Sequence, residues 1–274
     1  MTVERGSIFG LIGPNGAGKT SLIKIALTIA HPTRGEVRLL GQGTGDRSVF
    51  KRVGYLPESP RFPAHLTASN VLRLYGSMSG RDMHYIRRKS PEWLERVGLS
   101  GWERVRVSKF SKGMVERLAF AQAVIHDPDL IFLDEPTDGL DPLGRMEMRK
   151  ICRELADAGK TIFINSHILA EIETVCDRVA LMKSGRILDV GTVEDFTSGG
   201  ESYEVTVATG DDLEVWLRSQ ALDFSTTDGR LHIVLPDRNS ANQLIDTLRA
   251  RDIEIESVTP RRKSLESVFL ERVC

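Results

Sequence analysis

Short apolar runs alternate with longer segments of helical periodicity between residue 7 and about residue 195. The apolar runs, bounded by glycine, proline or polar residues, predict strands at 7–12, 35–41, 53–58, 130–133, 161–165 and 179–182. Between them, apolar residues recur every three or four positions and predict helices at 21–30, 70–78, 82–97, 115–125, 142–156 and 168–176. This alternation indicates an α/β fold, in which a parallel sheet is covered by helices on both faces.

The pattern changes at residues 198–200, where we expect a domain boundary. Strands are expected beyond it at 203–208, 222–226, 231–235 and 253–258, with helices at 211–219, 240–250 and 264–272. The first six of these elements follow the order β-α-β-β-α-β, which is typical of a ferredoxin-like α+β domain. Asp228-Gly229 predicts a hairpin turn within it. We therefore expect domains at 1–198 and 201–274, with a helical insertion at about 68–108 in the first.

Composition excludes several classes of protein. The chain has 274 residues, of which 41% are apolar and 27% charged, and its formal net charge is −1. This balance suits two folded domains and gives no global attraction to nucleic acid or anionic lipid. Cys152, Cys176 and Cys274 have no paired spacing, so neither a disulfide framework nor a metal site is indicated. No segment approaches the roughly 18 uncharged apolar residues of a membrane span, so any membrane role must come through a partner chain.

Glycines and a lysine follow the first predicted strand in a pattern that binds phosphate. Residues 13–20 read GPNGAGKT and match G-x-x-x-x-G-K-[ST]. Between a strand and a helix N-terminus, glycines let backbone N–H groups approach phosphates, and the helix dipole adds partial positive charge. Lys19 is expected to reach the β- and γ-phosphates, and the Thr20 hydroxyl to bind Mg²⁺. The expected nucleotide contacts here are Gly13, Asn15, Gly16, Ala17, Gly18, Lys19, Thr20 and Ser21.

Two further polar motifs each follow a predicted buried strand: Asp134-Glu135 and Ser166-His167. Together with the phosphate-binding loop and the segment FSKGM at 110–114, they make the chain resemble the ATP-binding subunits of ABC transporters. The resemblance is strongest to bacterial exporters whose permease is a separate polypeptide. It covers residues 7 to about 195, and SLESVF at 264–269 is similar to the ending of this subgroup.

The resemblance implies a P-loop NTPase fold with a helical subdomain, and roles for three side chains. Asp134 looks like the Walker B aspartate, and a carboxylate at the tip of a buried strand can hold Mg²⁺ or its water. Glu135 corresponds to the general base that orients the water attacking the γ-phosphate. His167 matches the switch histidine, which is expected to contact the γ-phosphate and help position Glu135 and the water.

Two more motifs imply contacts between subunits. Residues 110–114 align with the signature motif, usually LSGGQ, from which Lys112 and Met114 depart. In the family this segment closes over the γ-phosphate held by the other subunit, so Ser111 and the Gly113 backbone are expected nucleotide contacts. Residues 139–141 look like the D-loop, which crosses the dimer interface. Asp141 is thus a further expected contact, although it could equally cap the helix that begins at Pro142.

Two departures from the family pattern concern the nucleotide itself. The Q-loop glutamine is replaced by Glu58, which can approach Mg²⁺ or water but cannot donate a hydrogen bond as an amide does. The family also has about two short strands and an adenine-stacking aromatic before the phosphate-binding loop, and no residue upstream of Phe9 is aromatic here. One lost stacking contact costs on the order of 1–3 kcal/mol. The sequence leaves open whether this segment is truncated or natively absent.

The resemblance therefore predicts an ATP-hydrolysing, Mg²⁺-dependent motor subunit. Two copies, or closely related ATPase subunits, would sandwich two ATP molecules head to tail. The helical insertion and the loop around Glu58 would grip a coupling helix of an integral membrane permease, which places the protein peripherally at the cytoplasmic side of the membrane. The permease selects the transported substrate, so neither the substrate nor the direction of transport is encoded in this chain.

Two alternatives from other classes remain open at this point. One is a soluble ABC-type ATPase that acts on DNA or ribosomes, although such chains usually carry two cassettes or a long coiled-coil insertion. The other is a weakly hydrolysing or non-hydrolysing regulatory subunit, against which the set Lys19, Asp134, Glu135 and His167 argues. The C-terminal domain could serve as a dimer brace, a sensor or a nucleic-acid platform. Its basic run at 260–263 is interpreted as a solvated turn, and no nucleic-acid partner is expected.

Overall fold

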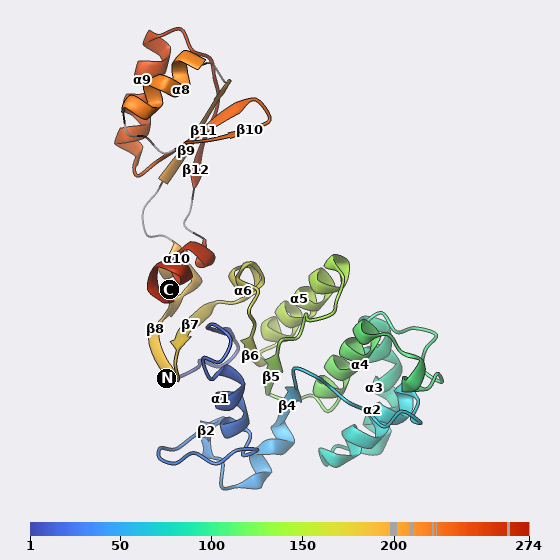
Figure 1. Cartoon of the computed structure of the whole chain (residues 1–274). Coiled ribbons are helices and arrows are strands. Elements are labelled where there is room, and N and C mark those ends of the chain that lie inside the picture. Colours follow the sequence, from blue (N-terminus) through green and yellow to red (C-terminus); the bar gives the residue numbers. More distant parts are fainter. Residues whose placement is uncertain (198–201, 209–210, 221, 223, 262–263, 274) are drawn as a thin grey trace. The chain divides into compact units, whose positions relative to one another are not determined.

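The computed structural model describes residues 1–197, 202–208, 211–220, 222, 224–261 and 264–273. The chain divides into two compact units, of which the first spans Met1–Thr192 and the second runs from Val193 to Arg272 (Figure 1). The boundary expected at residues 198–200 lies outside the described residues, so the proposed domain limits stay a prediction.

A six-stranded sheet forms the centre of the first unit, in the order β4-β5-β6-β1-β7-β8. The strands are β1 (Ile8–Ile12), β4 (Val53–Leu56), β5 (Leu130–Asp134), β6 (Thr161–Asn165), β7 (Arg178–Lys183) and β8 (Arg186–Thr192). The first five pair in parallel, and β8 runs antiparallel to β7 at the edge. Every residue of β1, β5 and β6 is buried, which explains why their sequences are continuous apolar runs and not alternating patterns.

Helices cover both faces of this sheet, as the strand–helix alternation predicted. Helix α1 (Lys19–Ala26) packs on β5, whereas α5 (Pro142–Asp157) and α6 (Leu169–Val175) pack on β1. Phe9 lies in one core cluster with Ile23 of α1, and a Cβ built on its neighbour Gly10 would meet Ile172 of α6 at 2.8 Å. Because successive strand residues point to opposite faces, α1 and α6 cover opposite sides of β1.

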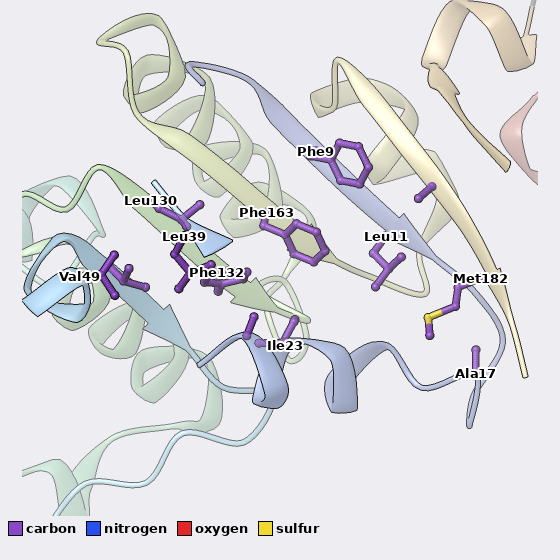
Figure 2. Packing of buried hydrophobic residues seen from close by; sticks show 13 residues of the cluster. Phe9, Leu11, Ala17, Ile23, Leu39, Val49, Leu130, Phe132, Phe163 and Met182 are labelled. Atoms are coloured by element: carbon purple, nitrogen blue, oxygen red, sulfur yellow. The ribbon is translucent and has the colours of Figure 1, made fainter. Parts of the chain in front are cut away.

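The core beneath α1 is built around three phenylalanines from neighbouring strands. The ring centroids of Phe9 and Phe163 lie 5.7 Å apart, and those of Phe132 and Phe163 lie 5.4 Å apart. Figure 2 shows Ile23 of α1 beside this row, with Leu11 and Met182 continuing it along the sheet. The packed row fixes the carboxyl ends of the parallel strands, where the motifs predicted to carry the chemistry begin.

The segment between α1 and β4 differs from the prediction. A helix was expected to continue to residue 30, but α1 ends at Ala26, Thr28 has φ +57° and Ile29 is exposed. The strand predicted at 35–41 shrinks to β2 (Arg38–Leu39), which pairs with β3 (Gln42–Gly43) in a two-stranded sheet. A 3₁₀ helix, η1 (Arg47–Arg52), then leads into β4. Turn geometry thus overrides the apolar pattern in this segment.

The two helices expected in the insertion are confirmed as α2 (Ala68–Met78) and α3 (Met83–Arg96). Thr67 and Asp82 cap them by accepting hydrogen bonds from the backbone N–H groups of Asn70 and Tyr85. Helix α2 packs on α3 and on α4 (Lys112–Val124), which follows the short 3₁₀ helix η2 (Val107–Lys109). The insertion is therefore attached to the sheet through α4, which packs on β4.

The second unit contains a four-stranded antiparallel sheet in the order β10-β11-β9-β12. Its elements are α7 (Val193–Thr197), β9 (Ser202–Ala208), α8 (Asp211–Ser219), β10 (Phe224–Thr227), β11 (Arg230–Leu235), α9 (Arg238–Ala250), β12 (Ile255–Arg261) and α10 (Leu265–Val273). The predicted β-α-β-β-α-β order is confirmed from β9 to β12. Asp228 and Gly229 both have positive φ and join β10 to β11, as the Asp-Gly pair predicted.

No helix within the described residues has the length and apolar character needed to cross a membrane.

Candidate functional site

The phosphate-binding loop lies at the carboxyl end of β1, beside the ends of β5 and β6. It borders a cleft of about 330 Å³ that is lined by residues 15–21, Glu58, Glu135 and Asn165. Four segments far apart in the sequence therefore meet there, and Glu58 lines the cleft together with the loop, while its expected role toward Mg²⁺ stays a prediction.

The backbone of the loop has a conformation that requires glycine at two positions. Gly18 has φ +104° and precedes the first turn of α1, while a Cβ on Gly13 would lie 2.4 Å from the carbonyl oxygen of Met182. Only glycine fits at both positions. The Lys19 ammonium donates to the carbonyl oxygens of Gly13, at 2.8 Å, and Pro14, at 3.3 Å. The lysine is thus folded back over the loop, and its ammonium group is held by loop carbonyl oxygens.

A buried carboxylate stands next to the loop at the end of β5. Asp134 is 1% exposed, and its Oδ1 accepts hydrogen bonds from Thr20 Oγ1 at 3.2 Å and from Asn165 Nδ2 at 2.5 Å. Burial raises the pKa of Asp134, and the two donors act in the opposite direction. Its Oδ2 is buried and has no hydrogen-bond partner within the described residues. A buried oxygen of this kind is the group that a bound cation would satisfy.

The oxygen atoms around Asp134 suit a Mg²⁺ ion that takes its other ligands from phosphate and water. No group of three or more His, Cys, Asp or Glu side chains in the described part of the chain could hold a metal ion unaided. Mg²⁺ is commonly held by one or two carboxylates together with substrate phosphates and water. Asp134, the Thr20 hydroxyl and the nearby Glu58 can supply the protein's share of such a shell.

Glu135 and His167 form a direct contact beside this carboxylate. Nδ1 of His167 lies 2.7 Å from Oε2 of Glu135, and the backbone N–H of His167 donates to the same oxygen at 3.2 Å. Glu135 has φ +55°, a conformation that is uncommon for a non-glycine residue and is held by the bond from its N–H to the carbonyl oxygen of Asn165. The pair can orient a water molecule and accept its proton.

The two segments expected to act between subunits both begin helices. Ser111 Oγ accepts a hydrogen bond from the N–H of Met114 at 3.3 Å, and Asp141 Oδ1 accepts one from the N–H of Gly144 at 2.9 Å. The helix-cap roles are thus confirmed. Ser111, Gly113 and Asp141 do not line the described cleft, and their expected contacts with nucleotide remain predictions.

Two residues that contact the predicted site residues or the turn beside them were missed by sequence reasoning. Asn165, which orients Asp134, is the last residue of an apolar run, and only the β5–β6 register, in which Asp134 pairs with Asn165, reveals its role. Glu171 accepts a hydrogen bond from Thr137 Oγ1 at 2.5 Å and lies 3.5 Å from an Arg145 nitrogen. It thereby ties α6, which follows His167, to the turn that follows Glu135.

An acid buried in α4 predicts a pH-dependent stability. Glu116 is 3% exposed, and burial raises its pKa to about 7, with Lys112 opposing the shift and Asp138 adding to it. The folded state therefore binds more protons than the unfolded state between pH 4.5 and about 7, so stability falls as pH rises through this window. We expect the free energy of unfolding of Glu116→Gln at pH 8 to exceed that of the wild type by about 1–2 kcal/mol. This is less than the pKa shift alone would give, because solvent screens the charge.

Urea denaturation of both proteins at pH 4.5, 6 and 8 measures this difference, with Glu36→Gln on the exposed surface as the control. The advantage of the Glu116 variant should vanish at pH 4.5 and grow toward pH 8. A constant difference at all three pH values would show that Glu116 does not titrate as the burial implies.

Comparisons with known proteins match both parts of the chain. Residues 1–138 match the family profile described as ABC transporter. Residues 191–273 match the profile described as ATP-binding protein DrrA1-3-like, C-terminal domain. The two matches fall on the two units of the fold.

Two relatives are similar over the whole chain, and one solved structure is similar over most of it. An uncharacterized ABC transporter ATP-binding protein of Nostoc sp. is 40% identical, over 100% of this chain and 81% of its own length. The bacitracin transport ATP-binding protein BcrA of Bacillus licheniformis is 34% identical, over 100% of this chain and 90% of its own. A solved structure described as the ATP binding subunit of an ABC transporter superposes with a TM-score of 0.67 and 31% identity, covering 72% of this chain and 82% of that one.

Proposed function

The chain belongs to the ATP-binding proteins of ABC transporters, which are ATPases, and on this premise we propose that it is the Mg²⁺-dependent motor subunit of an exporter. The observation that carries the proposal is the arrangement around Asp134. One edge of one sheet holds Lys19 and Thr20 of the phosphate-binding loop, the Glu135–His167 pair, and the Asp134 oxygen that has no partner among the described residues. These are the groups that phosphoryl transfer to water requires.

Each of these side chains has a distinct task in hydrolysis. The backbone N–H groups of the loop and the Lys19 ammonium bind the phosphates and offset their charge. Glu135 would orient the attacking water and accept its proton, while His167 contacts the Glu135 carboxylate and would approach the γ-phosphate. Thr20 and Asp134, with Glu58 nearby, would hold Mg²⁺, which when bound supplies charge neutralisation at the β- and γ-phosphate oxygens.

We propose that a second copy of the chain closes the cleft formed by the first. Ser111 and Gly113 belong to the helix start at α4 and do not line the cleft of their own chain. A helix N-terminus with a serine hydroxyl suits an anion, so we propose that Ser111 of one copy closes on the γ-phosphate bound by the other. Two copies related by a two-fold axis would then enclose two ATP molecules.

The proposed permease contact is the insertion together with the loop after β4. A cavity of about 400 Å³ lies there, lined among others by Tyr55, Phe62, Tyr75 and Met78. Met78 is 72% exposed, and the rings of Phe62 and Tyr75 meet edge to face at 5.6 Å. An apolar surface of this kind supports docking of a short helix of the permease, which would hold the protein at the cytoplasmic side of the membrane.

The dimer is tested with a variant that binds ATP without consuming it. We expect Glu135→Gln to elute as a dimer in size-exclusion chromatography with light scattering when Mg²⁺–ATP is present, and as a monomer in ADP. Adding Lys19→Ala to this variant should abolish the dimer, because the phosphates are no longer held. A Glu135→Gln protein that stays monomeric in saturating ATP would contradict the sandwich.

The choice between a transporter subunit and a soluble ATPase is tested by pull-down from cells. Recovery of an integral membrane protein by the tagged chain, lost when Met78 is replaced by aspartate, supports the proposed permease contact. Recovery of ribosomes or nucleic acid in its place would favour the soluble alternative.

A further inference from the structure

Lys112, at the first position of α4, forms an ion pair with Asp138 in the turn that follows Glu135. Its Nζ lies 2.7 Å from Oδ2 of Asp138, and the two side chains are 64% and 43% exposed. An exposed pair contributes little to stability by itself. The proximity of Lys112 holds the pKa of the Asp138 carboxyl below its usual range, and Asp138 raises the pKa of Lys112. The pair is therefore fully charged at neutral pH.

The stem of Lys112 is held by the same turn. A Cβ built on Gly139 would come within 2.9 Å of both Cδ and Cε of Lys112, so the aliphatic chain lies directly across this glycine. Gly139 has φ +75°, a conformation that a larger residue would adopt only with strain. Both the charge and the stem of Lys112 thus engage the turn.

The backbones of α4 and the turn also approach closely. A Cβ on Gly113 would lie 3.1 Å from the carbonyl oxygen of Gly139 and 3.7 Å from a methyl carbon of Leu140, which is 5% exposed. There is little room between the helix start and the turn. A change in the position of one is therefore transmitted to the other.

The turn is continuous with the residue proposed as the general base. The N–H of Asp138 donates to the carbonyl oxygen of Glu135 at 3.1 Å, and the N–H of Leu140 donates to that of Thr137 at 3.2 Å. Glu135 itself is in an uncommon backbone conformation, which persists only where its surroundings hold it. Asp138 is thus one hydrogen-bonded turn away from the Glu135 main chain.

We propose that Lys112 is a positioning residue for hydrolysis, whose ion pair with Asp138 holds the turn at 135–141 and thereby the orientation of Glu135. The inference rests on the proposed function, because it takes Glu135 as the base. Lys112 stands where the signature motif of the family usually has glycine, so this contact is a feature of the present sequence. It links the segment that would meet the partner's nucleotide to the base that acts on the chain's own nucleotide.

A double-mutant cycle tests the pair in the full chain. We expect Lys112→Gln and Asp138→Asn each to lower kcat about three- to tenfold, with KM for ATP changed less than about twofold, and the double variant to be no slower than either single one. Lys112→Arg, which keeps the cation, should retain most of the activity. The proposal would be overturned if the losses in kcat of the two single variants added up in the double variant. It would also be overturned if Lys112→Gln raised KM while Asp138→Asn left kcat and KM unchanged, because Lys112 would then act on the nucleotide.

The matched control is an ion pair of similar exposure in the second unit. Arg230 and Glu256 lie 2.5 Å apart with side chains 53% and 37% exposed, so Arg230→Gln removes a comparable surface charge. This variant should keep the kcat of the wild type. A loss equal to that of Lys112→Gln would assign the effect to net charge and not to the turn.

Hydrogen exchange of the nucleotide-free protein gives a readout that does not depend on turnover. In Lys112→Gln and in Asp138→Asn, the amides of residues 137–141 should exchange faster than in the wild type, while the amides of β5 stay protected. Unchanged exchange in both variants would overturn the positioning role. If the wild type itself shows no ATP turnover, the proposed function is contradicted. The exchange measurement then still decides whether the ion pair holds the turn.

Discussion

Replacing Glu135 with glutamine is expected to lower steady-state ATP turnover by at least about 100-fold, while ATP still binds. Glutamine keeps the size of the side chain and an oxygen that can accept the hydrogen bond from the His167 N–H. It loses the negative charge and the ability to take a proton from water. The variant therefore separates the chemical step from nucleotide binding.

Phosphate release measures the turnover, and a fluorescent ATP analogue measures the binding. Glu36→Gln, on the exposed surface beside Arg38, serves as the control and should match the wild type in both assays. If Glu135→Gln kept its turnover, Glu135 would not be the general base. The contact between His167 and Glu135 would then have no catalytic role.

Replacing Asp134 with asparagine is expected to abolish the stimulation of turnover by Mg²⁺, with a loss of at least about 100-fold. The amide cannot supply the charged oxygen that is left without a partner at Oδ2. Its amide oxygen can still accept the hydrogen bonds that Thr20 and Asn165 both donate to Oδ1 of the native carboxylate, so the NH₂ group takes the place of Oδ2. Since burial raises the pKa of Asp134, the charged form is costly in the apo protein.

Because the charge of Asp134 is costly in the absence of a cation, its removal should not lower the thermal stability of the nucleotide-free protein. We expect Asp134→Asn to have a Tm equal to or above that of the wild type without nucleotide, and to lose the increase in Tm that Mg²⁺–ATP gives the wild type. Asn165→Ala should show a smaller defect, on the order of tenfold in Mg²⁺ affinity, because it removes only the donor that orients Asp134. A variant that keeps its Mg²⁺ dependence would contradict the assignment of Asp134.

The buried strands and the motifs at their ends could be predicted because each leaves a local signal in the sequence. β5 and β6 are apolar runs that end in Asp134 and Asn165, and such runs are typical of strands buried on both faces. Strand β8 was missed, because its edge position leaves Arg186, Ile187 and Leu188 exposed and no clear apolar run remains. The predicted end of α1 was wrong because the left-handed turn at Thr28 is not marked in the sequence by a residue such as glycine.

The contacts between segments could not be predicted in the same way. The support that Asn165 gives Asp134 depends on strand register, which a single sequence does not specify. The pairing of Lys112 with Asp138 depends on how α4 packs against the turn after Glu135, across 26 positions of the chain. The sequence predicted the residues that carry charge at the site, and the fold is needed to see what holds them in place.

The measurement that most directly tests the central claim is complementation between two inactive variants. Lys19→Ala destroys the phosphate-binding loop of its own chain, and Ser111→Arg blocks the signature segment that would serve the partner. In a head-to-tail dimer of the two variants, one site carries both lesions and the other carries neither. Mixing equal amounts should therefore restore up to about a quarter of the wild-type ATP turnover, since about half of the dimers are mixed. A mixture as inactive as its components would contradict the claim that each ATP is enclosed by two chains.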